Sequence, residues 1–208
     1  MKSVVIGAHL RRGDVEPLAT ALRCGDLWLS GVDVADDQPL GDRELLLRVA
    51  NTRAQLLERA TFIAIRYGFA VHGASEAEAK CAEHLARWRR VLEANRDNVE
   101  MTLKVAVSEP RPRPDRRDFA GGADYLRALH GAAQAADVDP RFREAVSSIG
   151  THRWTHRDGR SLECALLVAR ADVARVRERG EQLKREFQQI PFLLSGPWPL
   201  EIFADDHQ

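Results

Sequence analysis

The chain has 208 residues, of which 44% are apolar and 30% charged, so it can bury a core as one large domain or two small ones. Its 31 Lys and Arg residues are balanced by 31 Asp and Glu residues, and this zero net charge argues against general binding to a nucleic-acid backbone. No stretch approaches the roughly 18 consecutive apolar residues of a membrane-spanning helix, and the N-terminus has too short an apolar run for a secretory signal. Cys24, Cys81 and Cys164 form no CxxC pair, which favours reduced thiols.

The first 107 residues alternate between expected strands and helices. Apolar runs and alternation predict strands at residues 2–8, 26–34, 61–65 and 100–107. Helical periodicity predicts a short helix at 16–22 and longer helices at 43–60 and 75–95. The loop at 36–42 supplies an N-cap for the second helix, and Ser75 with Glu78 has the spacing of a capping box for the third. This mixture predicts an α+β domain whose helices cover one side of a sheet.

Residues 108–118, SEPRPRPDRRD, form the clearest boundary in the chain. Proline at every second position from Pro110 to Pro114 blocks a helix and favours an extended spacer. The arginines of this segment could bind an acidic partner. We favour the alternative that the segment is a solvated linker, which its charges keep extended. We therefore expect an N-terminal domain at residues 1–109, a linker at 110–118 and a C-terminal domain at 119–208.

The second half of the chain predicts another small α+β unit. A helix is expected at residues 123–136, and Asp139-Pro140 opens a shorter one that ends near residue 148. Strands at 152–156 and 162–168 flank an Asp-Gly turn that is typical of a hairpin. The next helix, at 171–189, is apolar at spacings of three and four except at Gly180, where we expect a neighbouring backbone to pass close. The run at 192–194 is the last expected strand.

A search for reactive groups finds no strong candidate site in the sequence. The best metal candidate pairs His152 with His156 and takes Cys164 or His130 as a further ligand. It lacks the glutamate of an HExxH motif, and surface histidines on a strand are commoner than ligands. The paired glycines at 121–122 have no phosphate-loop pattern and indicate a plain helix start. We therefore expect no catalytic, cofactor-binding or metal site.

Short motifs follow one another along the chain and end in FLLSGPWP at residues 192–199, before Ile202 and Phe203. Earlier stretches, in order, are IAIRYG at 63–68, SEAE at 75–78, EMTLKV at 100–105, GADYL at 122–126 and ALLVA at 165–169. In kind, order and spacing these motifs resemble the gas vesicle protein GvpL/GvpF family, and the likeness covers nearly the whole chain. Two departures are Leu200-Glu201-Ile202, where the family has Pro-Tyr-Ser, and Ala64, where it has proline.

The resemblance implies a non-enzymatic accessory protein of gas vesicle formation, located in the cytoplasm and at the gas vesicle. The implied partners are the small hydrophobic shell protein and other gas vesicle accessory proteins, with no cofactor. It also implies two domains, the second with a ferredoxin-like core bearing helical additions. Alternatives are a minor structural component of the vesicle and an unrelated α+β protein that binds a ligand or metal. The family-motif positions, to which we assign a structural role, are Arg66, Gly68, Tyr125, Leu126, Gly196, Pro197, Trp198, Pro199 and Phe203.

The Gly-Pro-Trp-Pro segment also has a direct physical interpretation. Gly196 allows a sharp turn, the flanking prolines fix φ, and Trp198 offers a large ring for burial. Since large aromatic side chains are usually buried, we expect the segment to pin the exit of the last strand against a core. For function, we expect an apolar groove or an open sheet edge that covers the exposed apolar surface of a shell-protein monomer.

Overall fold

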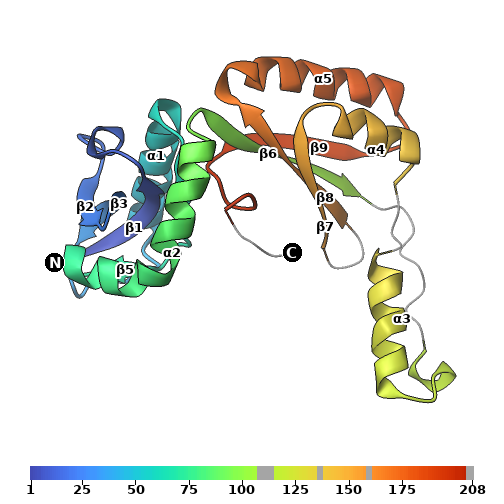
Figure 1. The fold of residues 1–208 in the computed structure, drawn as a ribbon, viewed down its shortest axis with the longest axis horizontal. Helices are drawn as coiled ribbons and strands as arrows, with labels where there is room; N and C mark the ends of the chain where they lie inside the picture. The colour runs from blue at the N-terminus through green and yellow to red at the C-terminus, as the bar shows by residue number, and fades with distance from the viewer. Residues whose placement is uncertain (107–114, 135–137, 158–160, 205–208) are drawn as a thin grey trace. The chain divides into compact units, whose positions relative to one another are not determined.

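The computed structural model describes residues 1–106, 115–134, 138–157 and 161–204 (Figure 1). The chain packs into two compact units, one formed by Met1–Val99 with Trp198–Gln208 and the other by Glu100–Pro197. Each unit combines an antiparallel sheet with helices, so the predicted α+β class is confirmed. Most of the expected linker at 110–118 lies outside the described residues, and the domain boundaries drawn from it stay a prediction.

The sheet of the first unit has the strand order β2-β3-β1-β4, with β5 also paired to β1. The β2–β3 hairpin turns at Gly25, whose φ of 58° lies in the left-handed region that glycine adopts at no steric cost. A 3-10 turn, η1, at Arg12–Asp14 precedes this hairpin. The strands are β1 Lys2–His9, β2 Thr20–Cys24, β3 Leu27–Val34, β4 Ile63–Ala64 and β5 Ala70–Val71.

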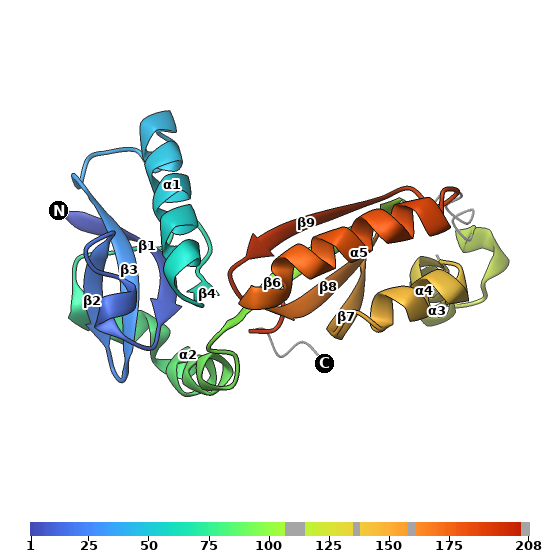
Figure 2. The same ribbon diagram turned by 90° about the horizontal axis from the view of Figure 1, so that it is seen from above.

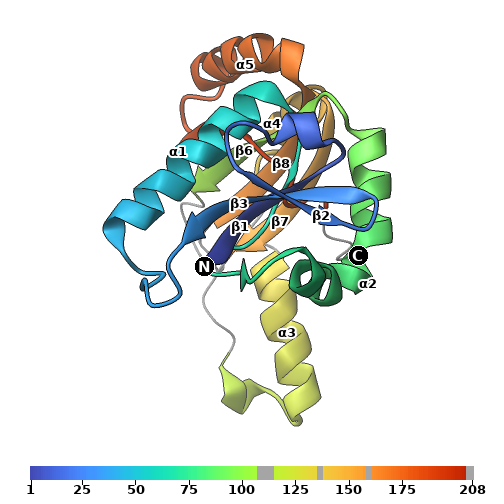
Figure 3. The same cartoon turned by 90° about the vertical axis from the view of Figure 1, so that its left-hand side faces the viewer.

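Helices α1, Arg43–Arg59, and α2, Ala74–Ala94, cover opposite faces of this sheet (Figure 3). Asp42 caps α1 by accepting a hydrogen bond from the Leu45 amide at 2.9 Å, as the loop before the helix predicts. The α1 face of the core contains Val4, Ile6, Val32, Val34, Leu45, Val49, Leu56 and Phe62. Strand residues that alternate with these face α2, and both faces of the sheet are therefore buried. The expectation that helices cover only one side is wrong.

The second unit has a four-stranded sheet in the order β7-β8-β6-β9, with α4 and α5 on one face (Figures 1 and 2). Phe142 and Val146 of α4 and Val176 and Leu183 of α5 enter the core of this unit. The same core takes Met101, Leu103, Val105, Leu162, Cys164 and Leu166 from the strands. The elements are β6 Asn98–Ala106, η2 Arg116–Asp118, α3 Gly122–Gln134, α4 Pro140–Ser147, β7 Thr151–Arg157, β8 Ser161–Ala169, η3 Arg170–Asp172, α5 Val173–Glu186 and β9 Phe192–Trp198.

Three local expectations differ from the structure. The helix expected at 16–22 is wrong, because Pro17 follows a turn and residues 20–24 pair with β3 instead. Ser75 does not cap α2; the helix begins at Ala74, and the Glu76 carboxylate reaches back to accept from the His72 amide at 2.6 Å. The strand expected at 100–107 forms as β6, but it lies in the second sheet and not in the first.

Candidate functional site

The Gly-Pro-Trp-Pro segment ends β9 in a conformation that requires glycine. Gly196 has φ of 116°, and a Cβ built on it would lie 3.0 Å from the Glu100 carbonyl oxygen and 3.2 Å from the Met101 Cα. Its own carbonyl oxygen accepts a hydrogen bond from Nη2 of Arg177 on α5 at 2.8 Å. Because of the close approach to β6 and the left-handed φ, any residue other than glycine would be strained at this position.

The residue that anchors the chain after this segment is Leu200. Its side chain is fully buried, its amide donates to the Phe62 carbonyl at 2.9 Å, and its carbonyl accepts from the Ala64 amide at 2.9 Å. These bonds add Leu200 to β4 as a parallel bridge opposite Ile63. Trp198 is 49% exposed, and the expectation that its ring is buried is wrong. The chain is thus held by backbone pairing and a leucine two residues beyond the tryptophan.

The other family-motif residues are distributed over both units. Arg66 is exposed, and Gly68 has φ of 97°, which explains a glycine at that turn. Tyr125 of α3 lies under the guanidinium of Arg116, 5.6 Å from its ring centroid, while Leu126 is 62% exposed. The C-terminal segment contains the remaining motif residues, Pro197, Pro199 and Phe203. The structural role assigned to the set stays a prediction.

In the metal candidate of the second unit, His152 is already hydrogen-bonded and Cys164 is buried. Both ring nitrogens of His152 have partners, the Ser147 hydroxyl and the Gly150 carbonyl, each at 3.1 Å. Cys164 is fully buried opposite Trp154, and burial raises the pKa of its thiol to about 12. The side chains of His130 and His156 lie outside the described residues. Among the residues that are described, no three His, Cys, Asp or Glu side chains gather as metal ligands.

His9 is a buried titratable group that the sequence analysis did not single out. Its ring is fully buried in the first unit, stacks on Phe62 at 4.9 Å between centroids, and lies 2.9 Å from the Ser30 hydroxyl through Nε2. Burial lowers the pKa of His9 to about 3, so the ring is neutral at pH 7. Its place on an otherwise apolar strand, in register with core residues, is the sequence signal that marks it as a packing residue.

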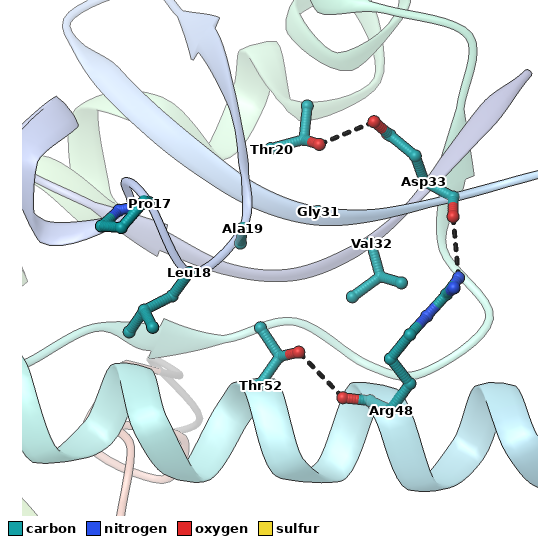
Figure 4. A pocket seen from close by; sticks show the side chains of 9 residues that line it. All are labelled: Pro17, Leu18, Ala19, Thr20, Gly31, Val32, Asp33, Arg48 and Thr52. Carbon is teal, nitrogen blue, oxygen red and sulfur yellow. Dashed lines mark hydrogen bonds between the residues drawn. The ribbon is translucent and has the colours of Figure 1, made fainter.

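An open pocket of about 460 Å³ lies in the first unit where β2 begins, between β3 and α1 (Figure 4). Arg48 of α1 donates from Nη2 to the Asp33 carbonyl at 2.7 Å, and Thr20 donates to the Asp33 carboxylate at 2.7 Å. Thr52 donates to the Arg48 carbonyl at 2.8 Å, and Leu18 and Val32 supply apolar lining. The sequence analysis missed this pocket because it expected a helix where the residues before β2 form an irregular wall.

This pocket resembles a docking groove more than a reaction centre. β2 pairs with β3 only as far as Gly31, which lies opposite Thr20, so β3 continues past the start of β2. The backbone of Asp33 therefore faces the pocket at an open edge. No cysteine or histidine lines the wall, and its hydroxyls and charges bond one another. Such a groove can take an extended or helical segment of another chain.

Comparison with known proteins gives a family and a fold. The family model described as "Gas vesicle synthesis protein GvpL/GvpF" matches residues 10–200. The crystal structure of gas vesicle protein GvpF from Microcystis aeruginosa is similar with a TM-score of 0.69 at 10% identity, covering 98% of this chain and 99% of that one. That of GvpF from Anabaena sp. PCC7120 gives 0.65 at 10% identity, covering 100% and 99%. No curated protein matches the sequence. Within the described residues, every helix is too short or too polar to span a membrane.

Proposed function

Since the chain belongs to the GvpL/GvpF family of gas vesicle synthesis proteins, we propose that it is a non-enzymatic accessory protein of gas vesicle formation. The observation that carries this proposal is the family match across residues 10–200. The shared fold with two GvpF crystal structures, over nearly the full length of each chain, supports it. The role is one of binding, and its partners are the small hydrophobic shell protein of the vesicle and other accessory proteins.

The physical task of such a protein is to cover apolar surface. A shell subunit exposes apolar side chains before it assembles, and an uncovered apolar patch aggregates. On the first unit, Leu46 and Leu47 of α1 are 42% and 54% exposed. They do not share the helix face of Arg48 and Thr52, which line the pocket of Figure 4. We assign the shell-protein monomer to these two exposed leucines, which we call the α1 surface.

Co-purification tests the proposal in two steps. In a vesicle-forming host, the tagged wild-type chain is expected to retain the shell protein, and its failure to do so would contradict the binding role. A variant with Leu46→Ser and Leu47→Ser is expected to retain much less. Leu126→Ser is the matched control, because Leu126 is an exposed helical leucine of the second unit. Equal retention by the variant and the control would exclude the α1 surface as the binding site while leaving the family role intact.

Flotation separates an accessory protein from a resident part of the vesicle. Deletion of the gene for this chain is expected to abolish or reduce floating cells. Washed, floated vesicles are expected to contain little of the protein if it acts only during assembly. A constant ratio of this chain to shell protein after repeated flotation would instead assign it to the vesicle as a minor structural component.

We also propose that Glu100–Pro197 is a ferredoxin-like core with helical additions. The element sequence supports this: β6 is followed by helices, then β7 and β8, then α5 and β9. The strand order β7-β8-β6-β9 places the first and third strands of the unit at the centre, as in a split βαβ arrangement. Expression of this segment alone as a folded protein would test whether it is an independent domain.

A further inference from the structure

Strand β9 forms an open edge of the sheet in the second unit. The strand order β7-β8-β6-β9 gives it one neighbour, β6, and within the described residues no strand pairs with its other side (Figure 2). The Ala106 amide at the end of β6 donates to the Pro191 carbonyl at 3.1 Å. Near the start of β6, the Met101 Cα would lie 3.2 Å from a Cβ built on Gly196. β9 therefore runs antiparallel to β6.

The direction of the backbone groups of β9 follows from these contacts. In an antiparallel pair, residues that bond to the neighbouring strand alternate with residues whose amide and carbonyl point the other way. The Pro191 carbonyl points toward β6, so the backbone of Leu193, two residues further on, also points toward β6. The amides and carbonyls of Phe192 and Leu194 therefore point to the open side of the sheet.

The two ends of this open edge are closed. Pro191 has no amide to donate, and the Gly196 carbonyl accepts from Nη2 of Arg177 on α5 at 2.8 Å. Gly196 is an even-numbered position like Phe192 and Leu194, so a carbonyl that is bonded by a side chain of α5 agrees with the alternation. The segment that can accept another strand is thus the short run from Phe192 to Leu194.

The side chains of this edge lack the usual protection against pairing. Native proteins commonly place charged residues on an edge strand, because an uncovered apolar edge pairs with other strands. β7, at the opposite edge of the same sheet, carries Arg153. Residues 190–200, IPFLLSGPWPL, contain no charged side chain, and Leu193 in the middle of the open run is 61% exposed. β9 thus combines free backbone groups with an apolar surface.

We propose that β9 pairs antiparallel with β9 of a second copy of this chain, about a two-fold axis at Leu193. Phe192 then lies opposite Leu194 of the second copy, and their outward amides and carbonyls bond each other. Leu193 lies opposite Leu193 of the second copy in a pair without hydrogen bonds, where side chains approach most closely. The pairing covers the exposed leucine and leaves the bond between Arg177 and Gly196 in place.

A second copy suits this edge because the strand is complementary to itself. A two-fold antiparallel pair brings identical side chains together, and like charges placed opposite each other are destabilising. The uncharged run at 190–200 meets this condition, whereas the same pairing at β7 would bring together the arginines of two copies. The contact is much smaller than a standard protein interface, so we expect a dissociation constant in the micromolar range.

Light scattering after size-exclusion chromatography tests the pairing on the full chain, over roughly 1–100 μM protein. The mass of the wild type is expected to rise with concentration from the 23.3 kDa of one chain toward twice that value. Leu193→Lys and Leu193→Glu each place like charges at the axis and should weaken association at least about tenfold. An equimolar mixture of the two variants should associate again, because lysine then lies opposite glutamate.

Leu126→Lys is the matched control for these variants. Leu126 lies on α3 of the same unit and is 62% exposed, almost the same as Leu193, so the substitution changes charge and exposure equally. This control is expected to associate as the wild type does. Circular dichroism should show the wild-type fold in all three variants, because both leucines are largely exposed.

Amide hydrogen exchange locates the contact on β9. Protection of the Phe192 and Leu194 amides is expected to increase with protein concentration in the wild type and not in Leu193→Lys. A wild type that stays monomeric, an equal loss of association in Leu126→Lys, or a mixture of the Lys and Glu variants that fails to associate would each overturn the proposal. Protection of these amides only when the shell protein is added would assign the edge to that partner and would also overturn pairing between copies.

Discussion

Replacing Leu200 with alanine is expected to cost far more stability than replacing Trp198. Leu200 is fully buried against β4, and truncating a buried leucine typically costs 2–5 kcal/mol, so we expect about 3 kcal/mol for Leu200→Ala. Trp198 is 49% exposed, so Trp198→Ala loses roughly half of the 1.5–3 kcal/mol that full burial of a large apolar side chain contributes, or about 1 kcal/mol. The order of the two effects is opposite to what side-chain size alone predicts.

Urea unfolding followed by far-UV circular dichroism measures both free energies, with Leu47→Ala as the exposed control expected within about 0.5 kcal/mol of wild type. Amide hydrogen exchange at Ala64 and Leu200 gives a local test, because the Ala64 amide donates to the Leu200 carbonyl and the Leu200 amide to that of Phe62. Both amides should lose protection in Leu200→Ala and keep most of it in Trp198→Ala. A larger loss for the tryptophan variant would refute the assignment of Leu200 as the anchor.

Three further predictions follow from buried groups and helix ends. His9 is protonated near pH 6.5 in the unfolded chain but only near pH 3 in the folded one. Its contribution to the free energy of unfolding is therefore fully present above pH 6.5 and is lost as the pH falls below that value, by at most about 1.4 kcal/mol per pH unit. Urea unfolding at pH 7 and pH 5 should show a smaller loss of stability for His9→Gln than for the wild type. Gly180→Ala should destabilise the wild type by about 1 kcal/mol, because the new Cβ would lie 2.6 Å from Leu194 Cδ2. In a Leu194→Ala background that contact is gone, so the same change should stabilise the protein by up to about 1 kcal/mol through the higher helix propensity of alanine. Destabilisation in both backgrounds would contradict the clash. Asp42→Ala should lower the unfolding free energy by about 1 kcal/mol, whereas Asp42→Asn should lower it by less.

The elements that the sequence predicted well have local causes. α1 begins after an N-cap and repeats its buried residues at helical spacing, and both signals lie within one short window. α4 begins at Pro140 after the Asp139 cap for the same reason. At Gly180 the sequence predicted a close neighbour, and there is one, although it is the side chain of Leu194 and not a backbone.

The failures concern pairing between distant residues. The sequence of residues 16–22 does not predict that Thr20 lies opposite Gly31. Because of this pairing, residues 20–24 form an edge strand where a helix was expected. The alternation in β6 predicted a strand but could not name its neighbours, which are β8 and β9. The pocket beside Arg48 is formed by the start of β2, the end of β3 and a face of α1, so no single motif could have located it.

The Gly-Pro-Trp-Pro segment is where the chain returns to the first unit, which it left after Val99. Gly196 still belongs to the second sheet, through its approach to Glu100, while Leu200 pairs with the first through Phe62 and Ala64. Fixing φ at the two prolines reduces the conformations of the free segment and favours the one path that brings Leu200 to β4. The glycine, the prolines and Leu200 thus account for the anchoring without the indole ring. Trp198 is the residue of the motif whose size the packing does not require, so a partner contact within the motif is best sought there.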